Sequence, residues 1–220
     1  MTFSLAGRCA RTGMLGVAVT TSGIAVGSRC GFAEAGVGAV LTQHRTDPRL
    51  GPAGIALLRD GKNAEATIQA LALGTPDRDW RQLAAIDAQS GTAFFHGAHI
   101  RSVHDGVRAK DCVAIGNILA NASVPAAIAA AFTQDPAAPL AERLLQGLEA
   151  GLAAGGERGP IRSAALLVVH QHSFPYVDLR VDDADAPLAV LRTLWTAYAA
   201  QADDYVTRAI DPAALGPSQG

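Results

Sequence analysis

The first quarter of the chain alternates apolar and polar positions with the two-residue period of half-buried β-strands. Short polar turns separate three such segments, residues 2–6, 15–19 and 24–28, which predicts an antiparallel meander. Residues 37–43 are apolar almost throughout, which predicts a strand buried on both faces. One face of the second and third segments carries only small side chains, at Gly16, Ala18, Ala25 and Gly27. Such a face indicates close approach by a backbone or ligand, or tight packing between layers.

Two helices are predicted after these strands. Pro52 fits a first helical turn that leads to Gly61, and Asn63 fits the N-cap of a second helix that stops at Gly74. Later strands are predicted at residues 83–87, 93–95, 112–115, 163–169 and 177–181, and later helices at 126–132, 140–153 and 187–208. Strand blocks that alternate with helix pairs favour an α+β, four-layer αββα sandwich, in which two antiparallel sheets pack face to face.

The chain is predicted to form a single domain over residues 1–210. The Gly/Pro-rich segment at residues 155–160 is the only candidate linker, and it falls between elements of this expected core. Residues 211–220 are rich in Pro, Gly and Ser, which predicts a frayed tail.

The amino-acid composition indicates which partners and which cellular compartment fit the protein. An apolar fraction of 49%, a charged fraction of 17% and a net charge of −2 without a basic cluster argue against nucleic-acid and membrane partners. Cys9, Cys30 and Cys112 are widely spaced, which fits a reducing cytoplasm better than disulfides or structural zinc. No apolar run approaches about 18 residues, so neither export nor a membrane span is expected.

Candidate chemistry begins at Thr2, at the end of the first predicted strand. Removal of Met1 would leave Thr2 with a hydroxyl nucleophile and a free α-amine of pKa about 8, which can accept the hydroxyl proton. The alternative is an ordinary second residue, because many chains begin with Met-Thr.

Several ordered segments resemble a bacterial family, domain of unknown function 1028, which is grouped by fold with the N-terminal-nucleophile hydrolases. They are residues 2–4, 35–43, 51–58, 86–88, 116–119, 139–145, 163–169 and 178–183. The resemblance implies the four-layer sandwich and amide-bond hydrolysis, and no cofactor is expected. Residues 29–32 and the short loop 170–176 depart from the family pattern, which bears on substrate specificity.

Amide and guanidinium groups at predicted strand ends complete the candidate site. Gln43 and Asn117 could donate hydrogen bonds to an oxyanion, or they could instead satisfy loop backbone. Candidates for substrate binding lie at or beside strand ends, where Arg can hold a carboxylate through two hydrogen bonds; they are Ser28, Arg29, Arg162 and Ser163. Asp178, Arg180 and Asp182 alternate along one strand face, as an ion-paired ladder or a clamp on a charged substrate.

Two sequence features argue against a lysine-assisted threonine nucleophile and against a zinc site. Related threonine hydrolases often place a lysine beside the nucleophile, whereas Lys62 and Lys110 are the only lysines and neither matches a strand position. The histidines of one predicted loop (His96, His99 and His104), or His170 with His172, could hold zinc with Asp105, but no tight ligand quartet is evident and no metal site is predicted.

The sequence therefore predicts an amidohydrolase that attacks a small amide or peptide bond with Thr2. The alternative is a non-catalytic small-molecule-binding or assembly protein on the same fold. Sheet edges in such sandwiches favour a homo-oligomer.

Overall fold

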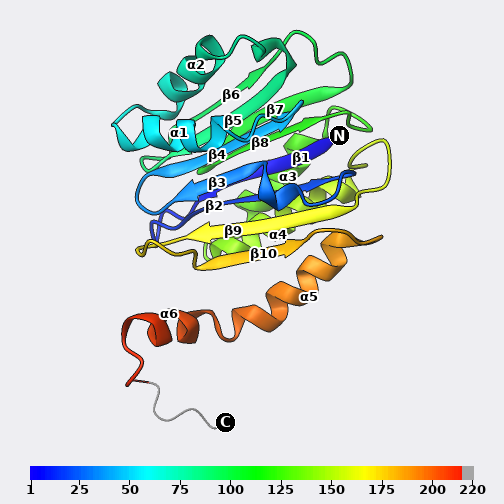
Figure 1. Cartoon of the computed structure of the whole chain (residues 1–220). Helices are drawn as coiled ribbons and strands as arrows, with labels where there is room; N and C mark the ends of the chain where they lie inside the picture. Colours follow the sequence, from blue (N-terminus) through cyan, green and yellow to red (C-terminus); the bar gives the residue numbers. More distant parts are fainter. Residues whose placement is uncertain (215–220) are drawn as a thin grey trace.

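Two antiparallel sheets form the centre of the protein in the computed structural model, which describes residues 1–214 (Figure 1). The larger sheet has the strand order β10-β9-β2-β1-β8-β7; its strands are β1 (Thr2–Arg8), β2 (Leu15–Thr21), β7 (His104–Ala109), β8 (Cys112–Asn117), β9 (Ser163–Val169) and β10 (Val177–Val181). The smaller sheet has the order β3-β4-β5-β6; its strands are β3 (Gly31–Glu34), β4 (Gly38–His44), β5 (Arg81–Asp87) and β6 (Thr92–His96).

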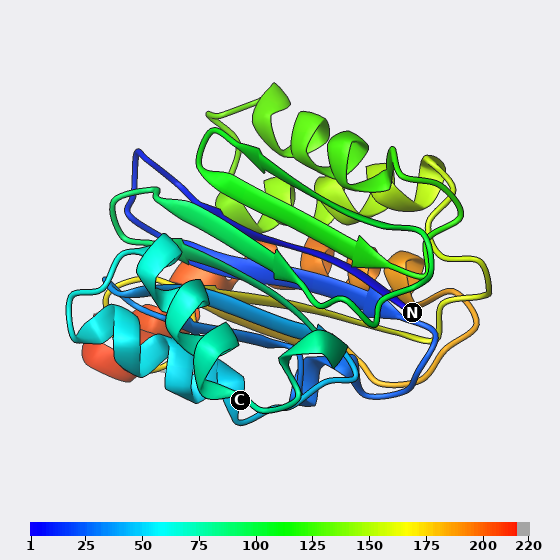
Figure 2. The same cartoon turned by 90° about the horizontal axis from the view of Figure 1, so that it is seen from above.

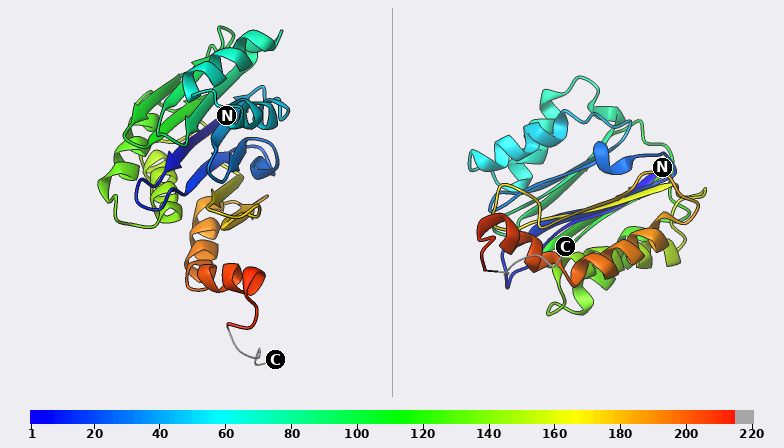
Figure 3. Two further views of the ribbon diagram at one scale, coloured as in Figure 1. Left: turned by 90° about the vertical axis from the view of Figure 1, so that its left-hand side faces the viewer. Right: turned by 60° about the horizontal axis from the view of Figure 1, so that its bottom comes forward.

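Helices cover the outer face of each sheet, so the α+β class and the two antiparallel sheets are confirmed (Figures 2 and 3). The smaller sheet carries α1 (Leu50–Arg59) and α2 (Ala64–Gly74). The larger sheet carries α3 (Val124–Gln134), α4 (Leu140–Ala153) and α5 (Pro187–Ala199), and α6 (Ala202–Ile210) continues beyond it. The short 3-10 helices η1 (Val26–Ser28) and η2 (Arg78–Trp80) lie in connections.

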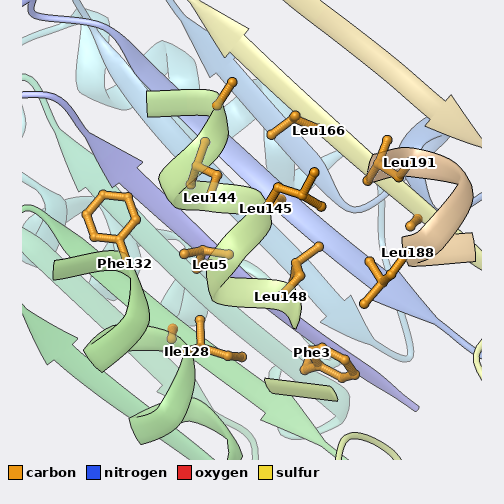
Figure 4. Packing of buried hydrophobic residues seen from close by; sticks show 14 of the residues in the cluster. Phe3, Leu5, Ile128, Phe132, Leu144, Leu145, Leu148, Leu166, Leu188 and Leu191 are labelled. Carbon is orange, nitrogen blue, oxygen red and sulfur yellow. The ribbon is translucent and has the colours of Figure 1, made fainter. Parts of the chain in front are cut away.

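Alternation along β1, a central strand, sorts its side chains between two layers. Phe3 and Leu5 point toward the outer helices and are fully buried. They pack on a helical cluster that includes Ile128, Phe132, Leu144, Leu145 and Leu148 (Figure 4). Burying side chains of this size contributes about 1.5–3 kcal/mol each. Ala6 belongs instead to the apolar core between the sheets, so Thr2 and Ser4 face that inner layer too.

The small-residue face of β2 is a tightly packed layer. A Cβ atom on Gly16 would lie 2.5 Å from the carbonyl oxygen of Leu167 and 3.0 Å from Cδ1 of Leu144. Ala18 faces the same helical cluster and is fully buried. Close packing of β9 and α4 therefore explains the small side chains on this strand.

Several predicted elements were wrong. The segment predicted as a third strand turns at Ala25 (φ 54°) into η1. The backbone N–H of Val26 donates to Ser163 Oγ at 3.1 Å, and so it does not pair with a neighbouring strand. Residues 31–34, for which no strand was predicted, pair with β4 as an edge strand. Strand β7 was missed, and with β6 it takes His96 and His104 out of the predicted loop.

The last predicted helix is divided between α5 and α6. Its backbone breaks at Ala200 and Gln201, and Tyr205 is 39% exposed. The ring of Tyr205 stacks on that of Tyr198. Of the predicted frayed tail, positions 215–220 lie outside the described residues.

Candidate functional site

At one end of the sandwich, the layer between the sheets changes from apolar to polar. The last inward-facing positions of neighbouring strands carry hydroxyl or amide groups that are at most 5% exposed; they are Thr2, Ser4, Thr21, Gln43, Gln82, Asn117 and Ser163. Apart from Thr2, whose neighbour at this spacing is Ser4, each lies two residues from an apolar side chain of the inner layer. The strand registers bring these ends together, since Thr2 pairs with Asn117, Thr21 with Ser163 and Gln43 with Gln82.

Gln82 is the centre of a hydrogen-bond network that joins the two sheets. Its Oε1 accepts hydrogen bonds from Gln43 Nε2 at 2.6 Å and from Asn117 Nδ2 at 2.8 Å. Its Nε2 donates to the carbonyl of Gly116 at 2.8 Å and to Nδ1 of His96 at 2.9 Å. Ser4 Oγ donates to Gln43 Oε1 at 2.7 Å and so links β1 to the network. The amides of Gln43 and Asn117 are thereby held in fixed orientations.

His96 is a neutral member of this network. Burial, with a smaller contribution from the charge of His104, lowers the pKa of His96 to about 4. A neutral ring leaves Nδ1 free to accept from Gln82, which places the ring proton on Nε2. Nε2 is buried and has no hydrogen-bond partner among the described residues.

Thr2 lies between hydroxyl and amide groups at the start of β1. Its Oγ1 is 3.2 Å from Oγ1 of Thr21, and both hydroxyls donate to the carbonyl oxygen of Met1. On the other side, Asn117 is its cross-strand neighbour. Asn117 Oδ1 is buried, and within residues 1–214 no group donates a hydrogen bond to it. The Thr2 side chain therefore lies among hydroxyl, carbonyl and amide groups.

Glu157 supplies a carboxyl group at the same end. It is 6% exposed, and its Oε2 accepts the backbone N–H of Ser22 at 3.1 Å. Burial raises the pKa of Glu157 to about 7, although the α-ammonium group of Met1 acts in the opposite direction. The same ammonium charge lowers the pKa of His44, for which burial is the larger cause, and opposes the rise in the pKa of Cys30 caused by burial. The charge at the start of the chain thus acts on Glu157, His44 and Cys30.

The backbone is strained next to both site amides. His44, directly after Gln43, has φ 65°, and Ile118, directly after Asn117, has φ 53°. A branched residue such as Ile rarely adopts this left-handed conformation. Strain of this kind costs about 1–3 kcal/mol per residue and clusters at functional sites.

The predicted site residues fall into two groups. Thr2, Gln43 and Asn117 come together at the polar end. Ser163 is buried beside them, but its hydroxyl donates to the carbonyl of Gly23 at 2.7 Å and accepts from Val26, so it holds the turn before η1.

Three predicted substrate-binding residues are engaged elsewhere. Ser28 is exposed, and its hydroxyl donates to the carbonyl of Ala25 at 2.8 Å. Arg29 donates to backbone carbonyls of its own turn. Arg162 forms surface ion pairs with Asp183 and Asp185. Their side chains therefore serve the local loops.

Lysine is absent from the polar end, because Lys62 and Lys110 are exposed at the opposite ends of the strands. Sequence reasoning missed Thr21, Gln82 and Glu157, and it considered His96 only as a possible zinc ligand. Thr21 continues the inward face of Val17 and Val19, a signal that could have found it. Glu157 lies in the loop predicted as a linker candidate and carries no sequence signal.

A separate groove opens at the edge where the six-stranded sheet extends past the four-stranded one. Its volume is about 790 Å³, and it is lined by apolar residues and two ion pairs, among them Phe32, Ile55, Leu167, Val169, Glu34 with Arg59, and Asp178 with Arg180. Ser28 also lines it, whereas Thr2 does not. Arg180 donates to Asp178 at 2.8 Å, so two of the three members of the alternative ion-paired ladder are paired.

Residues 1–214 contain neither a metal-binding cluster nor a membrane-spanning helix. No group of three or more His, Cys, Asp or Glu side chains could hold a metal ion. The ring centroids of His96 and His104 lie 5.2 Å apart with the ring planes inclined at 69°, and no third ligand lies with them. In the same residues, every helix is too short or too polar to cross a membrane.

Comparison with known proteins gives the family. The profile of a family of unknown function, DUF1028, matches residues 2–191. The chain belongs to this family. The crystal structure of the DUF1028 protein SPO2555 from Silicibacter pomeroyi is similar, with a TM-score of 0.84 and 30% sequence identity over 90% of this chain and 85% of that one.

Two further comparisons add no functional argument. Anbu (ancestral beta-subunit) from Yersinia bercovieri aligns over 92% of this chain and 97% of the Anbu chain. The TM-score of 0.39 and the identity of 10% are too low to indicate a shared function. No curated protein sequence matches the DUF1028 chain.

Proposed function

We propose that this DUF1028 protein is an N-terminal-nucleophile amidohydrolase in which Thr2 attacks a small amide or peptide bond after cleavage of the Met1–Thr2 bond. The observation that carries the proposal is the position of Thr2. It opens a central strand, and its hydroxyl lies at the polar end of the layer between the sheets. The layered arrangement supports the fold group that the sequence resemblance implies.

The proposed reaction uses the α-amine of Thr2 as its base. The amine takes the proton of Oγ1 while Oγ1 bonds to the substrate carbonyl carbon. The resulting ammonium returns that proton to the leaving nitrogen as the C–N bond breaks, which leaves an ester on Thr2. Water then adds to the ester with the amine again as base, and the acid departs as Oγ1 recovers its proton. The free amine, with a pKa of about 8, needs no lysine for these transfers.

Fixed amides support stabilisation of the oxyanion. Asn117 Nδ2 and Gln43 Nε2 each donate one hydrogen to Gln82, and an amide nitrogen carries two. The second hydrogen of each can donate to the tetrahedral oxygen. Donors that the protein holds in place in advance contribute about 3–4 kcal/mol each to such steps.

The direct test is hydrolysis of a panel of small amides and dipeptides by the chain that begins at Thr2. Thr2→Ala should lower kcat/KM about 10³-fold or more, and Thr2→Ser should retain part of the activity because it keeps a hydroxyl. Thr193→Ala, which removes an exposed hydroxyl of α5, is the matched control. Equal activity of Thr2→Ala and the unchanged chain would refute the proposal.

The groove between β3 and β10 favours a second candidate, small-molecule binding without catalysis. A volume of about 790 Å³ lies within the range of ligand sites. Ala35→Trp should fill the groove and abolish binding of any metabolite found by calorimetric screening, whereas Thr2→Ala should leave it intact. Loss of the same binding in Thr2→Ala would tie the ligand to the first candidate.

A further inference from the structure

Glu157 lies beside the start of β1, where the chain enters the larger sheet. Strand β1 is flanked by β2 and β8. The carboxyl group of Glu157 binds the backbone N–H of Ser22, directly after β2, and its backbone forms a bridge with Leu119, shortly after β8. One residue thus contacts the ends of both flanking strands, at the place where Met1 leads into Thr2.

The side chain of Met1 enters the same loop. A Cβ atom on Gly159 would lie 3.6 Å from the methyl carbon of Met1 and 3.8 Å from its sulfur. The carbonyl of Met1 is bound by the Thr21 hydroxyl, one residue before Ser22. Loss of Met1 therefore leaves the nitrogen of Thr2 facing the space between Thr21 and the loop that carries Glu157.

One oxygen of Glu157 has no hydrogen-bond partner. Oε2 binds Ser22, while Oε1 is buried and no group in the described part of the chain donates to it. An unpaired oxygen of a buried carboxyl group is destabilising, because no hydrogen bond offsets its lost hydration. The hydrogen bond to the backbone of Ser22 uses only Oε2, so it does not explain why Oε1 is buried without a partner.

We propose that Oε1 of Glu157 accepts a hydrogen bond from the α-amine of Thr2 in the chain that lacks Met1. Glu157 is then a positioning residue. Its hydrogen bond orients the amine so that the nitrogen lone pair points toward Oγ1, and it keeps the amine near Oγ1 while the nitrogen carries the proton. This inference rests on the proposed function, because it gives a role to the amine that the reaction uses as a base.

The charges around this carboxyl group define the expected pH behaviour. The charge of the α-amine acts on this carboxyl group, and the same charge acts on His44 of β4 and on Cys30 before β3. A carboxylate beside an amine favours the charged ammonium and raises its pKa. Because the two groups titrate close together, their protons leave as a coupled pair.

The test is the pKa of the Thr2 α-amine, measured by NMR on the Met1-free chain labelled with ¹⁵N-threonine. Glu157→Gln keeps an acceptor for Ser22 and removes the charge, so the amine should bind its proton about tenfold more weakly, a fall of about one pKa unit. Glu65→Gln, an exposed carboxylate paired with Arg108 on another layer, should leave the amine unchanged. An unchanged amine pKa in Glu157→Gln would overturn the inference.

A second measurement does not depend on the folding of a variant. In the unchanged Met1-free chain, the ¹³C shift of the Glu157 carboxyl should show a second inflection at the pKa of the amine, and a single inflection would overturn the inference. Amidase assays separate the two proposals. A shifted amine in a protein without amidase activity sinks the proposed function alone, and an active enzyme with an unshifted amine sinks the role of Glu157 alone.

Discussion

The hydroxyl oxygen of Thr2 lies 3.2 Å from that of Thr21 on the neighbouring strand β2. Antiparallel register sets this relationship, because Phe3 pairs with Thr20 and so brings Thr2 beside Thr21. Both side chains face the layer between the sheets. Thr21 is therefore placed to hold the nucleophile of the proposed reaction.

Thr21→Val is expected to lower kcat of the proposed amidase about fivefold, because one hydrogen bond to the nucleophile is worth about 1 kcal/mol. Steady-state kinetics on the Met1-free chain would show it. Thr20→Val is the matched control: Thr20 is equally buried on the same strand, but it binds the carbonyl of Ser163 from the opposite face. Equal loss in both variants would mean that strand packing, and not the hydroxyl of Thr21, matters.

Gln82→Leu is expected to destabilise the fold by about 3 kcal/mol or more. The change leaves buried groups of Gln43, Asn117 and Gly116 without their partner, and each costs about 1–3 kcal/mol. Urea unfolding measures the loss. Gln89→Leu, at an exposed position in the β5–β6 turn, should change stability by less than about 0.5 kcal/mol. A loss in Gln82→Leu no larger than in this control would contradict the network.

Stability should depend on pH through His96 and Glu157 with opposite signs. Because the pKa of folded His96 is lowered to about 4, its contribution is complete above about pH 6.5 and is lost as pH falls toward 4. Since His96 is only partly buried, screening reduces the effect to about 2 kcal/mol.

Folded Glu157 has a raised pKa of about 7, so its contribution is complete below about pH 4.5 and is lost as pH rises through 7. Glu157→Gln should therefore gain up to about 3 kcal/mol relative to the unchanged chain at pH 8, compared with pH 4.5. Chemical unfolding at the two pH values measures this difference. A pH-independent difference between the two proteins would show that the carboxyl group is not desolvated.

Gly51→Ala tests the packing of α1 on the edge strand β3. A Cβ atom at this position would lie 2.0 Å from Cδ2 of Phe32, so the ring must shift, at a cost of about 1–3 kcal/mol. Gly74→Ala is the control, because nothing lies within 4 Å of a Cβ atom there. It should be neutral or slightly stabilising. Thermal unfolding of both variants gives the comparison, and equal midpoints would contradict the predicted clash.

Much of the fold could be predicted because local signals agree with the tertiary structure. The Asn63 side chain caps α2 by accepting the backbone N–H of Ala66, as its position predicts. Apolar periodicity also located β4, α4 and β9. Strands β3 and β7 were missed because they lie at sheet edges, where half-buried side chains give little alternation.

The candidate site was predictable only where chemistry coincides with a strand end. Gln43 and Asn117 close β4 and β8, so their position indicated a shared edge. Gln82 and Glu157 were missed because the pairing of β4 with β5 and the fold of the loop after α4 bring them there. Arg29 and Arg162 show the converse, since loop carbonyls and acidic neighbours engage their guanidinium groups.

The central claim is tested most directly by the intact mass of the chain expressed without an added N-terminal tag. A chain that acts through the amine of Thr2 must have lost Met1, so the account predicts a mass that lacks this residue. A mass that includes Met1 in the active protein would contradict it, because the amine that the reaction requires would still be acylated.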